Sequence, residues 1–173
     1  GSLGARFLNH LLPKAISLLP SDSRPEIIHQ CGFKAVDEVK ALYAEAGVEA
    51  AVQPFIEDMA AAYTWSDLVL CRAGATSVSE ICSAGAASLL VPLVVKTTSH
   101  QLQNALFMEQ NGASRCLRQD TLTPERLSAV LASIDRAQLL SMAEAARKLS
   151  HSNAASAVAD MIESRADRTF RVS

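Results

Sequence analysis

Residues 68–77, LVLCRAGATS, join two kinds of structure. The first four residues form a continuous apolar run of the kind that is buried on both faces of a parallel sheet. The glycine-containing loop over residues 72–77 ends that run, and helical spacing follows from Val78 to Ala84, with Gly85 as its stop. A buried strand that leads through a glycine turn into a helix is the repeating unit of an α/β fold.

The same alternation runs through the chain. Short strands are predicted over residues 26–31, 48–53, 68–71, 87–92 and 114–117. Helices are predicted over residues 5–19, 36–46, 56–63, 78–84 and 100–110, followed by three closing helices over residues 127–134, 138–149 and 154–164. Strands that alternate with helices in this way predict a doubly wound α/β domain with a parallel sheet, spanning residues 1–173.

Composition excludes several other classes of protein. A chain of 173 residues that is 49% hydrophobic suits one ordinary globular domain. The net charge is −2, and the 16 basic residues are interspersed with 18 acidic ones, so nucleic acid is not an expected partner. The four cysteines show no paired spacing typical of zinc or redox sites, so we expect buried, reduced thiols. No apolar run approaches the roughly 20 residues of a membrane span.

The chain opens on the glycine-containing turn Gly1-Ser2-Leu3-Gly4-Ala5. Doubly wound domains normally have a strand that feeds such a turn, so we expect the natural protein to be longer. The glycines would let backbone amides approach a phosphate, and the hydroxyl of Ser2 could donate a hydrogen bond to it. The alternative is a simple turn at a helix start.

The loop over residues 72–77 is the second candidate ligand loop, because ligands of parallel sheets bind at the carboxyl ends of the strands. Free amides around Gly74, Ala75 and Thr76, together with the helix dipole, suit a diphosphate. Glu80 follows on the same helix, where its carboxylate could accept two hydrogen bonds from a ribose diol. Alternatively, Glu80 complements only the dipole of its helix.

The third candidate loop leads into His100, Gln101 and Asn104. Gln101 and Asn104 share a helix face, so their amides could bind sugar hydroxyls, although a solvated helix start is the alternative. His29, at a strand end, could line the same mouth or be a hydrogen-bonded structural residue. With no Ser-His-Asp order, metal-ligand cluster or paired catalytic carboxylates, the residues indicate ligand binding more than catalysis, and neither a metal nor a cofactor is expected.

Four motifs in order resemble those of the MurG-type glycosyltransferases of peptidoglycan synthesis. Residues 1–6 resemble the end of the GGSxGA loop, and residues 54–59 look like the FIxDM segment. Residues 71–80 are similar to the CRxGAxTxSE signature, and residues 100–105 to the HQxxNA element. Ser99 departs from the pattern, because an acidic residue commonly precedes the HQ pair.

The resemblance implies the C-terminal, donor-binding half of a GT-B enzyme with two Rossmann-like domains, and UDP-N-acetylglucosamine as ligand. It implies that the backbone of Ile56 binds uracil and that Phe55 lies against the nucleotide. Ser2 and the turn at Gly74, Ala75 and Thr76 would face the diphosphate. The resemblance also assigns Glu80 to the ribose, and it assigns Gln101 and Asn104 to the sugar, with His100 beside them.

The implied reaction is an inverting transfer of N-acetylglucosamine to a lipid-linked muramoyl-pentapeptide at the cytoplasmic side of the bacterial membrane, by a peripheral protein. An absent N-terminal domain would bind the acceptor and supply the base, so no catalytic residue is expected here and this chain alone should transfer little. The sequence has no DxD run, so amides and a helix dipole would stabilise the leaving group. The alternatives are another GT-B UDP-sugar transferase or epimerase, and a non-catalytic nucleotide-sugar-binding subunit.

Overall fold

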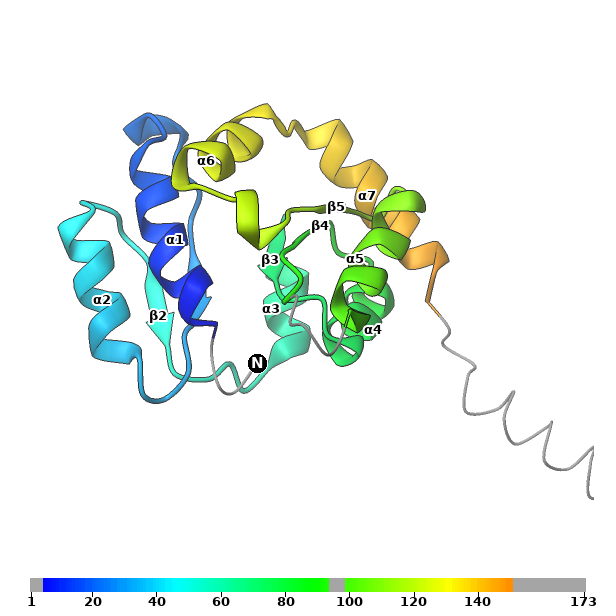
Figure 1. Ribbon diagram of the computed structural model, residues 1–173, viewed down its shortest axis with the longest axis horizontal. Coiled ribbons are helices and arrows are strands. Elements are labelled where there is room, and N and C mark those ends of the chain that lie inside the picture. Colours follow the sequence, from blue (N-terminus) through cyan, green and yellow to red (C-terminus); the bar gives the residue numbers. More distant parts are fainter. Residues whose placement is uncertain (1–4, 94–98, 151–173) are drawn as a thin grey trace, which may run out of the picture.

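The computed structural model describes residues 5–93 and 99–150, in which strands alternate with helices as predicted (Figure 1). The strands of this part are β1 (Ile28–Gln30), β2 (Ala51–Gln53), β3 (Val69–Cys71), β4 (Ser88–Leu90) and β5 (Ser114–Cys116). Its α-helices are α1 (Arg6–Ser17), α2 (Val36–Glu45), α3 (Met59–Trp65), α4 (Ala75–Ala84), α5 (His100–Gln110), α6 (Pro124–Ser133) and α7 (Arg136–Lys148). The helix expected over residues 154–164 lies outside the described residues.

The strand pairings within the described residues are all parallel. β1 pairs with β2, with Ile28 beside Ala51, and β4 lies between β3 and β5, with Ser88 beside both Val69 and Ser114. Parallel neighbours need a crossover, which α2, α4 and α5 supply. The predicted parallel α/β fold is confirmed, although the described strands form two hydrogen-bonded groups, β1-β2 and β3-β4-β5.

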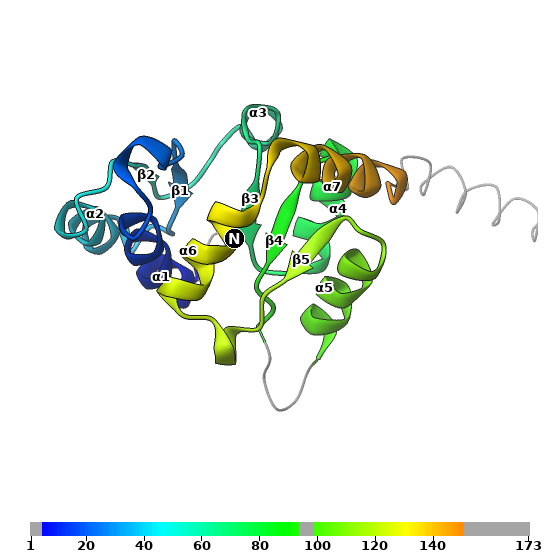
Figure 2. The same cartoon turned by 90° about the horizontal axis from the view of Figure 1, so that it is seen from above.

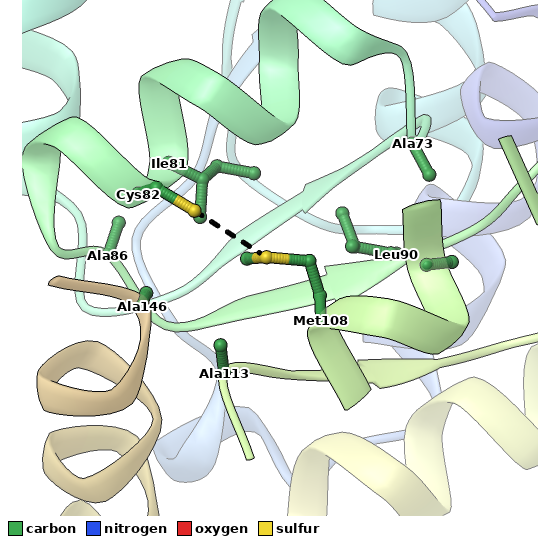
Figure 3. Packing of buried hydrophobic residues seen from close by; sticks show 9 residues of the cluster. Ala73, Ile81, Cys82, Ala86, Leu90, Met108, Ala113 and Ala146 are labelled. Atoms are coloured by element: carbon green, nitrogen blue, oxygen red, sulfur yellow. Dashed lines mark hydrogen bonds between the residues drawn. The ribbon is translucent and has the colours of Figure 1, made fainter. Parts of the chain in front are cut away.

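Both faces of the three-stranded group are covered, as Figure 2 shows. Leu89 and Val91 face a cluster that they share with α1 and α6, while Leu90, between them, faces α4, α5 and α7. The second cluster includes the Sγ of Cys82, 3.5 Å from the Sδ of Met108 (Figure 3). This alternation explains the continuous apolar run of β4, because successive side chains of a strand point to opposite faces.

Three of the described helices are followed by a glycine in the left-handed conformation, as was expected for Gly85. Gly47, Gly85 and Gly112 have φ values of +61°, +67° and +71°, a conformation that glycine adopts without steric cost. At Gly85 a Cβ atom would also lie 3.3 Å from the side chain of Arg147. Gly85 therefore ends α4 and lets α7 pack close to it.

Two helix starts differ from the prediction. α3 begins at Met59 rather than at residue 56, because the Asp58 carboxylate accepts a hydrogen bond from the backbone N–H of Ala61 at 2.8 Å. α4 begins at Ala75 rather than at Val78. Its first turn therefore contains the predicted diphosphate-binding residues themselves.

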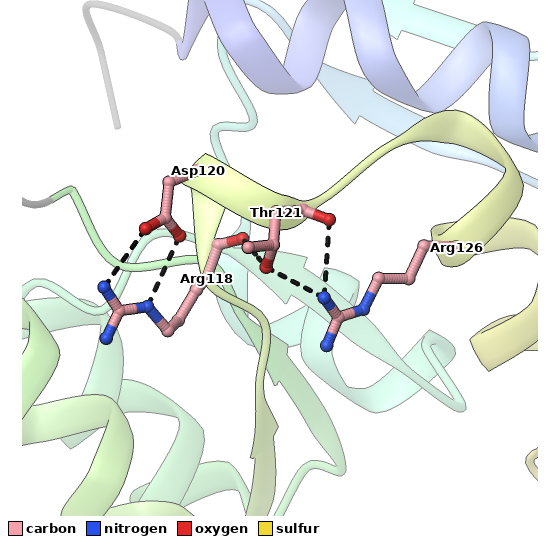
Figure 4. A network of polar contacts seen from close by, with 4 residues as sticks. All are labelled: Arg118, Asp120, Thr121 and Arg126. Carbon is pink, nitrogen blue, oxygen red and sulfur yellow. Dashed lines mark hydrogen bonds and ion pairs between the residues drawn. The ribbon is translucent and has the colours of Figure 1, made fainter.

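Short 3-10 turns, which the sequence analysis did not predict, occur over Ser21–Ser23 and Gln119–Thr121. The second connects β5 to α6 and is held by polar side chains (Figure 4). Arg118 pairs with Asp120 at 3.1 Å, and Nη1 of Arg126 donates to Oγ1 of Thr121 at 2.8 Å. These exposed contacts order the return of the chain towards α6.

The expectation of buried, reduced thiols is met in part. All four cysteines are free thiols, with Cys31 and Cys82 buried and Cys71 and Cys116 half-buried. Over residues 5–93 and 99–150, none of the helices combines the length and the apolar character needed to cross a membrane.

Candidate functional site

The N-terminus of α4 lies directly after the carboxyl end of β3. Its first helical hydrogen bond runs from the N–H of Val78 to the carbonyl of Gly74 at 3.0 Å, so the N–H groups of Ala75, Thr76 and Ser77 have no acceptor within the helix. No described side chain caps this end, and its first turn contains no acidic residue. It therefore offers amide donors and partial positive charge to an anion.

Gly74 adds no side chain to this end of α4. A Cβ atom there would meet no atom within 4 Å, and its φ of −64° suits any residue. The glycine is therefore needed neither by the local backbone nor by internal packing. Because Gly74 has no side chain, a ligand can approach the backbone amides at the start of α4 closely.

Glu80 lies further along the same helix and is exposed. Its Oε2 accepts a hydrogen bond of 3.0 Å from the hydroxyl of Tyr63 on α3. Glu80 comes five residues after Ala75, the first residue of α4, whereas the effect of a helix dipole falls off within the first turn. The dipole interpretation therefore does not account for a carboxylate at this position.

Gln101 and Asn104 connect α5 to the two neighbouring strand ends. Oε1 of Gln101 accepts from the backbone N–H of Leu93 at 2.9 Å, and Nδ2 of Asn104 donates to the carbonyl of Ala73 at 3.0 Å. One polar atom of each side-chain amide is thus already hydrogen-bonded within the protein, whereas both amides had been expected to bind sugar hydroxyls. Nε2 of Gln101 and Oδ1 of Asn104 take no part in these two bonds, and His100 is exposed at the start of the helix.

Phe55 and Ile56 lie on the loop after β2. The ring of Phe55 is 43% exposed and is nearly parallel to the ring of Phe33, with an interplanar angle of 12° and 6.5 Å between centroids. The backbone N–H of Ile56 donates to Oε1 of Gln30 at 3.1 Å. Of the Ile56 backbone, which was expected to bind uracil, the N–H is therefore occupied by a side chain of β1.

His29 is a structural residue rather than part of a binding mouth. It is 8% exposed, with Nε2 lying 3.1 Å from Oδ1 of Asn9 and Nδ1 lying 3.0 Å from the hydroxyl of Tyr43. Because Nδ2 of Asn9 donates to the carbonyl of Cys31, Oδ1 must accept, which assigns the proton to Nε2 of His29. Burial lowers the pKa of His29 to about 4.

Two hollows on the surface of the described residues do not contain the predicted site as a whole. One hollow of about 360 Å³ is lined by residues of β1, the loop after β2 and α3, and Ile56 is in its lining. Another, of about 260 Å³, lies beside Gly112 and Ser114, at the opposite edge of the sheet from the strand ends where ligands bind. The open α4 terminus and Glu80 lie on the surface instead.

Comparison with known proteins decides the family. A model described as glycosyltransferase family 28 C-terminal domain matches residues 1–163. The chain belongs to glycosyltransferase family 28. The family supports the Rossmann-like form of the α/β fold that the motifs had indicated.

Curated relatives of this family 28 chain include proteins from Methylibium petroleiphilum, at 54% identity over 94% of this chain, and Azoarcus sp., at 49% identity over 96%. Both are named UDP-N-acetylglucosamine--N-acetylmuramyl-(pentapeptide) pyrophosphoryl-undecaprenol N-acetylglucosamine transferase. The match covers 45% and 47% of those proteins, so the chain spans about half the length of its curated relatives.

Solved structures agree with the family 28 assignment. The crystal structure of Acinetobacter baumannii MurG matches with a TM-score of 0.87 and 43% identity, over 95% of this chain and 50% of that one. A glycotransferase of kitacinnamycin matches with a TM-score of 0.65 and 19% identity, over 92% of this chain and 39% of that one, which shows the fold alone.

The structure brings the predicted residues of this family 28 domain to the carboxyl ends of the strands, on α4, on α5 and on the loop after β2. Ser2 and the rest of the glycine-containing loop lie outside the described residues. The motifs of the sequence do not point to Tyr63 or Phe33, because neither belongs to one of them, and a single aromatic residue is more often a packing residue. Among residues 5–93 and 99–150 there is no cluster of three His, Cys, Asp or Glu side chains suited to a metal ion.

Proposed function

We propose that this chain binds UDP-N-acetylglucosamine as the donor-binding domain, residues 1–173, of a glycosyltransferase. The observation that carries the proposal is the open N-terminus of α4 on the same helix as the exposed Glu80. The first suits a diphosphate and the second suits a ribose diol. The names of the curated relatives, which specify UDP-N-acetylglucosamine, support the choice of this donor.

In this proposal the diphosphate binds to the backbone amides of Ala75 and Thr76 beside Gly74, and the hydroxyl of Ser2 adds a further donor. The uracil lies against Phe55 and binds the backbone of Ile56, either at its carbonyl or after displacing the Gln30 amide from its N–H. The N-acetylglucosamine would be bound by Nε2 of Gln101 and Oδ1 of Asn104, with His100 beside them.

The same residues suit an inverting transfer. As the acceptor hydroxyl attacks the anomeric carbon, the bond to UDP breaks and negative charge grows on the diphosphate. The amides of α4 are aimed at that charge before the reaction begins, and preorganised donors of this kind lower a barrier by about 3 kcal/mol each. The acceptor and its catalytic base would belong to a further domain, so this chain alone should bind donor but transfer little.

The acceptor we propose is the lipid-linked muramoyl-pentapeptide, because the relatives' names contain a pyrophosphoryl-undecaprenol carrier. Such a lipid would bring the whole enzyme to the cytoplasmic surface of the bacterial membrane as a peripheral protein. Peptidoglycan synthesis, and through it cell shape and division, would be the process that it serves.

Calorimetric titration with UDP-N-acetylglucosamine tests the donor site. We expect Glu80→Ala to weaken binding about tenfold or more, since hydrogen bonds to a charged group contribute about 1.5–3 kcal/mol. Glu144→Ala is the matched control, because Glu144 is an exposed acid on α7. Its affinity should equal that of the unaltered protein.

Two outcomes would contradict the proposal in different ways. If the unaltered protein does not bind the nucleotide sugar, the donor-binding function is wrong. If the protein binds it and Glu80→Ala binds equally well, only the ribose assignment of Glu80 is wrong. Competition with other UDP-sugars separates the proposed donor from those of related transferases or epimerases.

A further inference from the structure

Tyr63 and Glu80 come from different helices and meet at the proposed ribose site. We propose that Tyr63 is a positioning residue for ribose recognition: its hydroxyl holds Oε2 of Glu80 so that Oε1 faces the 2′- and 3′-hydroxyls. This inference rests on the proposed function, because it presupposes that Glu80 binds the ribose. The bond between the hydroxyl and Oε2 measures 3.0 Å.

The two partners differ in how firmly they are held. The ring of Tyr63 packs against the buried cluster of Ala73, Ile81 and Leu90, which fixes its place relative to α4. Glu80 is exposed, and its side chain has several rotatable bonds of its own. A fixed phenol therefore restrains a carboxylate that would otherwise sample several rotamers.

The direction of the hydrogen bond is settled by chemistry. An ionised carboxylate only accepts hydrogen bonds, so the phenol must be the donor. Burial, and after it the hydrogen bond and charge of Glu80, raise the pKa of Tyr63. The phenol keeps its proton at neutral pH and can go on donating it.

The carboxylate of Glu80 can accept further hydrogen bonds besides the one from Tyr63. Two carboxylate oxygens offer about four acceptor positions, and Tyr63 uses one of them. A ribose diol brings two donors, which Oε1 and the second lone pair of Oε2 can accept. Because Glu80 is already oriented, the nucleotide does not have to order it on binding, and this saves part of the entropic cost of association.

A purely structural role is the competing explanation, in which the bond only helps α3 to pack against α4. The two explanations differ in their dependence on the ligand. A positioning role matters only when the ligand has ribose hydroxyls, whereas a structural role affects every nucleotide equally.

The test compares UDP with 2′,3′-dideoxy-UDP in calorimetric titrations of the unaltered protein and Tyr63→Phe, a change that keeps the ring and removes the hydroxyl. We expect Tyr63→Phe to weaken UDP binding about fivefold, the scale of ordering one long side chain, and to leave the affinity for the dideoxy ligand unchanged. In a Glu80→Ala background, adding Tyr63→Phe should have no further effect on UDP binding.

Tyr43→Phe is the matched control, because Tyr43 is the other of the two tyrosines and its hydroxyl contacts His29 instead. It should leave the ratio of the two affinities as it is in the unaltered protein. Thermal melting of each variant measures any loss of stability separately from the ligand comparison.

The inference is overturned if Tyr63→Phe weakens both ligands equally, or weakens neither, while the unaltered protein prefers UDP and Glu80→Ala loses that preference. The proposed role of Glu80 would then stand without Tyr63. If the unaltered protein does not prefer UDP over the dideoxy ligand, the ribose assignment of Glu80 fails, and the role of Tyr63 fails with it.

Discussion

The helix N-termini at the proposed donor site differ from those that begin the last two described helices. Thr123 caps α6 through the N–H of Arg126, and Asp135 forms a reciprocal capping box with Gln138 at the start of α7. No described side chain caps α1, α4 or α5, and none of these three has an acidic residue in its first turn. α2 is also uncapped, but Asp37 and Glu38 in its first turn would repel an anion.

This contrast indicates that the chain leaves uncapped the helices whose first residues belong to the glycine-containing motifs and to the HQ motif. α3 differs, because Asp58 of motif residues 54–59 caps it, and the proposed nucleotide contacts of that motif come from Phe55 and Ile56 ahead of the helix. A side-chain cap satisfies the same N–H groups that a phosphate would bind, so one N-terminus cannot fully serve both purposes. The open helices must then be held by other contacts. For α1 one such contact is Asn9, which binds the carbonyl of Cys31 and the ring of His29.

The largest expected effect concerns that anchor of α1. Burial lowers the pKa of His29 from its ordinary value of 6.5 to about 4, so between those pH values the unfolded chain binds a proton that the folded protein does not. The contribution of His29 to the free energy of unfolding is therefore fully present above pH 6.5. It is lost as the pH drops towards 4, and the loss is roughly 3 kcal/mol in total. Urea denaturation at about pH 7 and about pH 4.5 measures the difference.

His29→Gln is the control for this pH dependence, because it removes the titrating group. The variant should lose less stability than the unaltered protein between the two pH values. Equal losses would mean that His29 takes up its proton without unfolding the protein, and that α1 does not depend on the neutral ring.

An intermediate effect is expected from closing the open end of α4. Gly74→Asp would place a carboxylate over the amides at the start of α4, and its Cβ would meet no described atom within 4 Å. Stability should rise by roughly 0.3 kcal/mol, whereas affinity for UDP should fall at least tenfold, about 1.4 kcal/mol. Thermal melting and calorimetry measure the two quantities.

Gly74→Asn separates charge from shape in this experiment, since the amide caps a helix as well as the carboxylate does. It should weaken UDP binding less than Gly74→Asp. If the two variants bind UDP equally, the diphosphate does not lie at this terminus.

The smallest effect should come from opening a capped helix. Asp135→Ala removes the capping box of α7 and should lower the free energy of unfolding by about 1 kcal/mol. Affinity for UDP should stay unchanged, because α7 packs against α4 from outside the proposed site. A loss of UDP affinity without a loss of stability would contradict the distinction between the capped helices and the uncapped helices of the proposed site.

Much of this architecture could be predicted from the sequence, because the relevant signals are local. Alternating apolar strands and amphipathic helices, and the stop at Gly85, each depend on neighbouring residues in the chain. The start of α3 was placed too early because the pattern of residues 56–63 hid the cap at Asp58. The start of α4 was placed too late because its first turn resembled a loop in composition.

The parallel α/β fold, the family motifs and the strand ends at which a ligand would bind all follow from the amino-acid order alone. Three-dimensional packing was needed to show that Tyr63 holds Glu80, that Gln101 and Asn104 each bind a neighbouring loop, and that His29 is buried. The reason is separation along the chain. These contacts join groups up to 31 positions apart, and no periodicity or spacing encodes which of them meet until the strands have paired and the helices have packed.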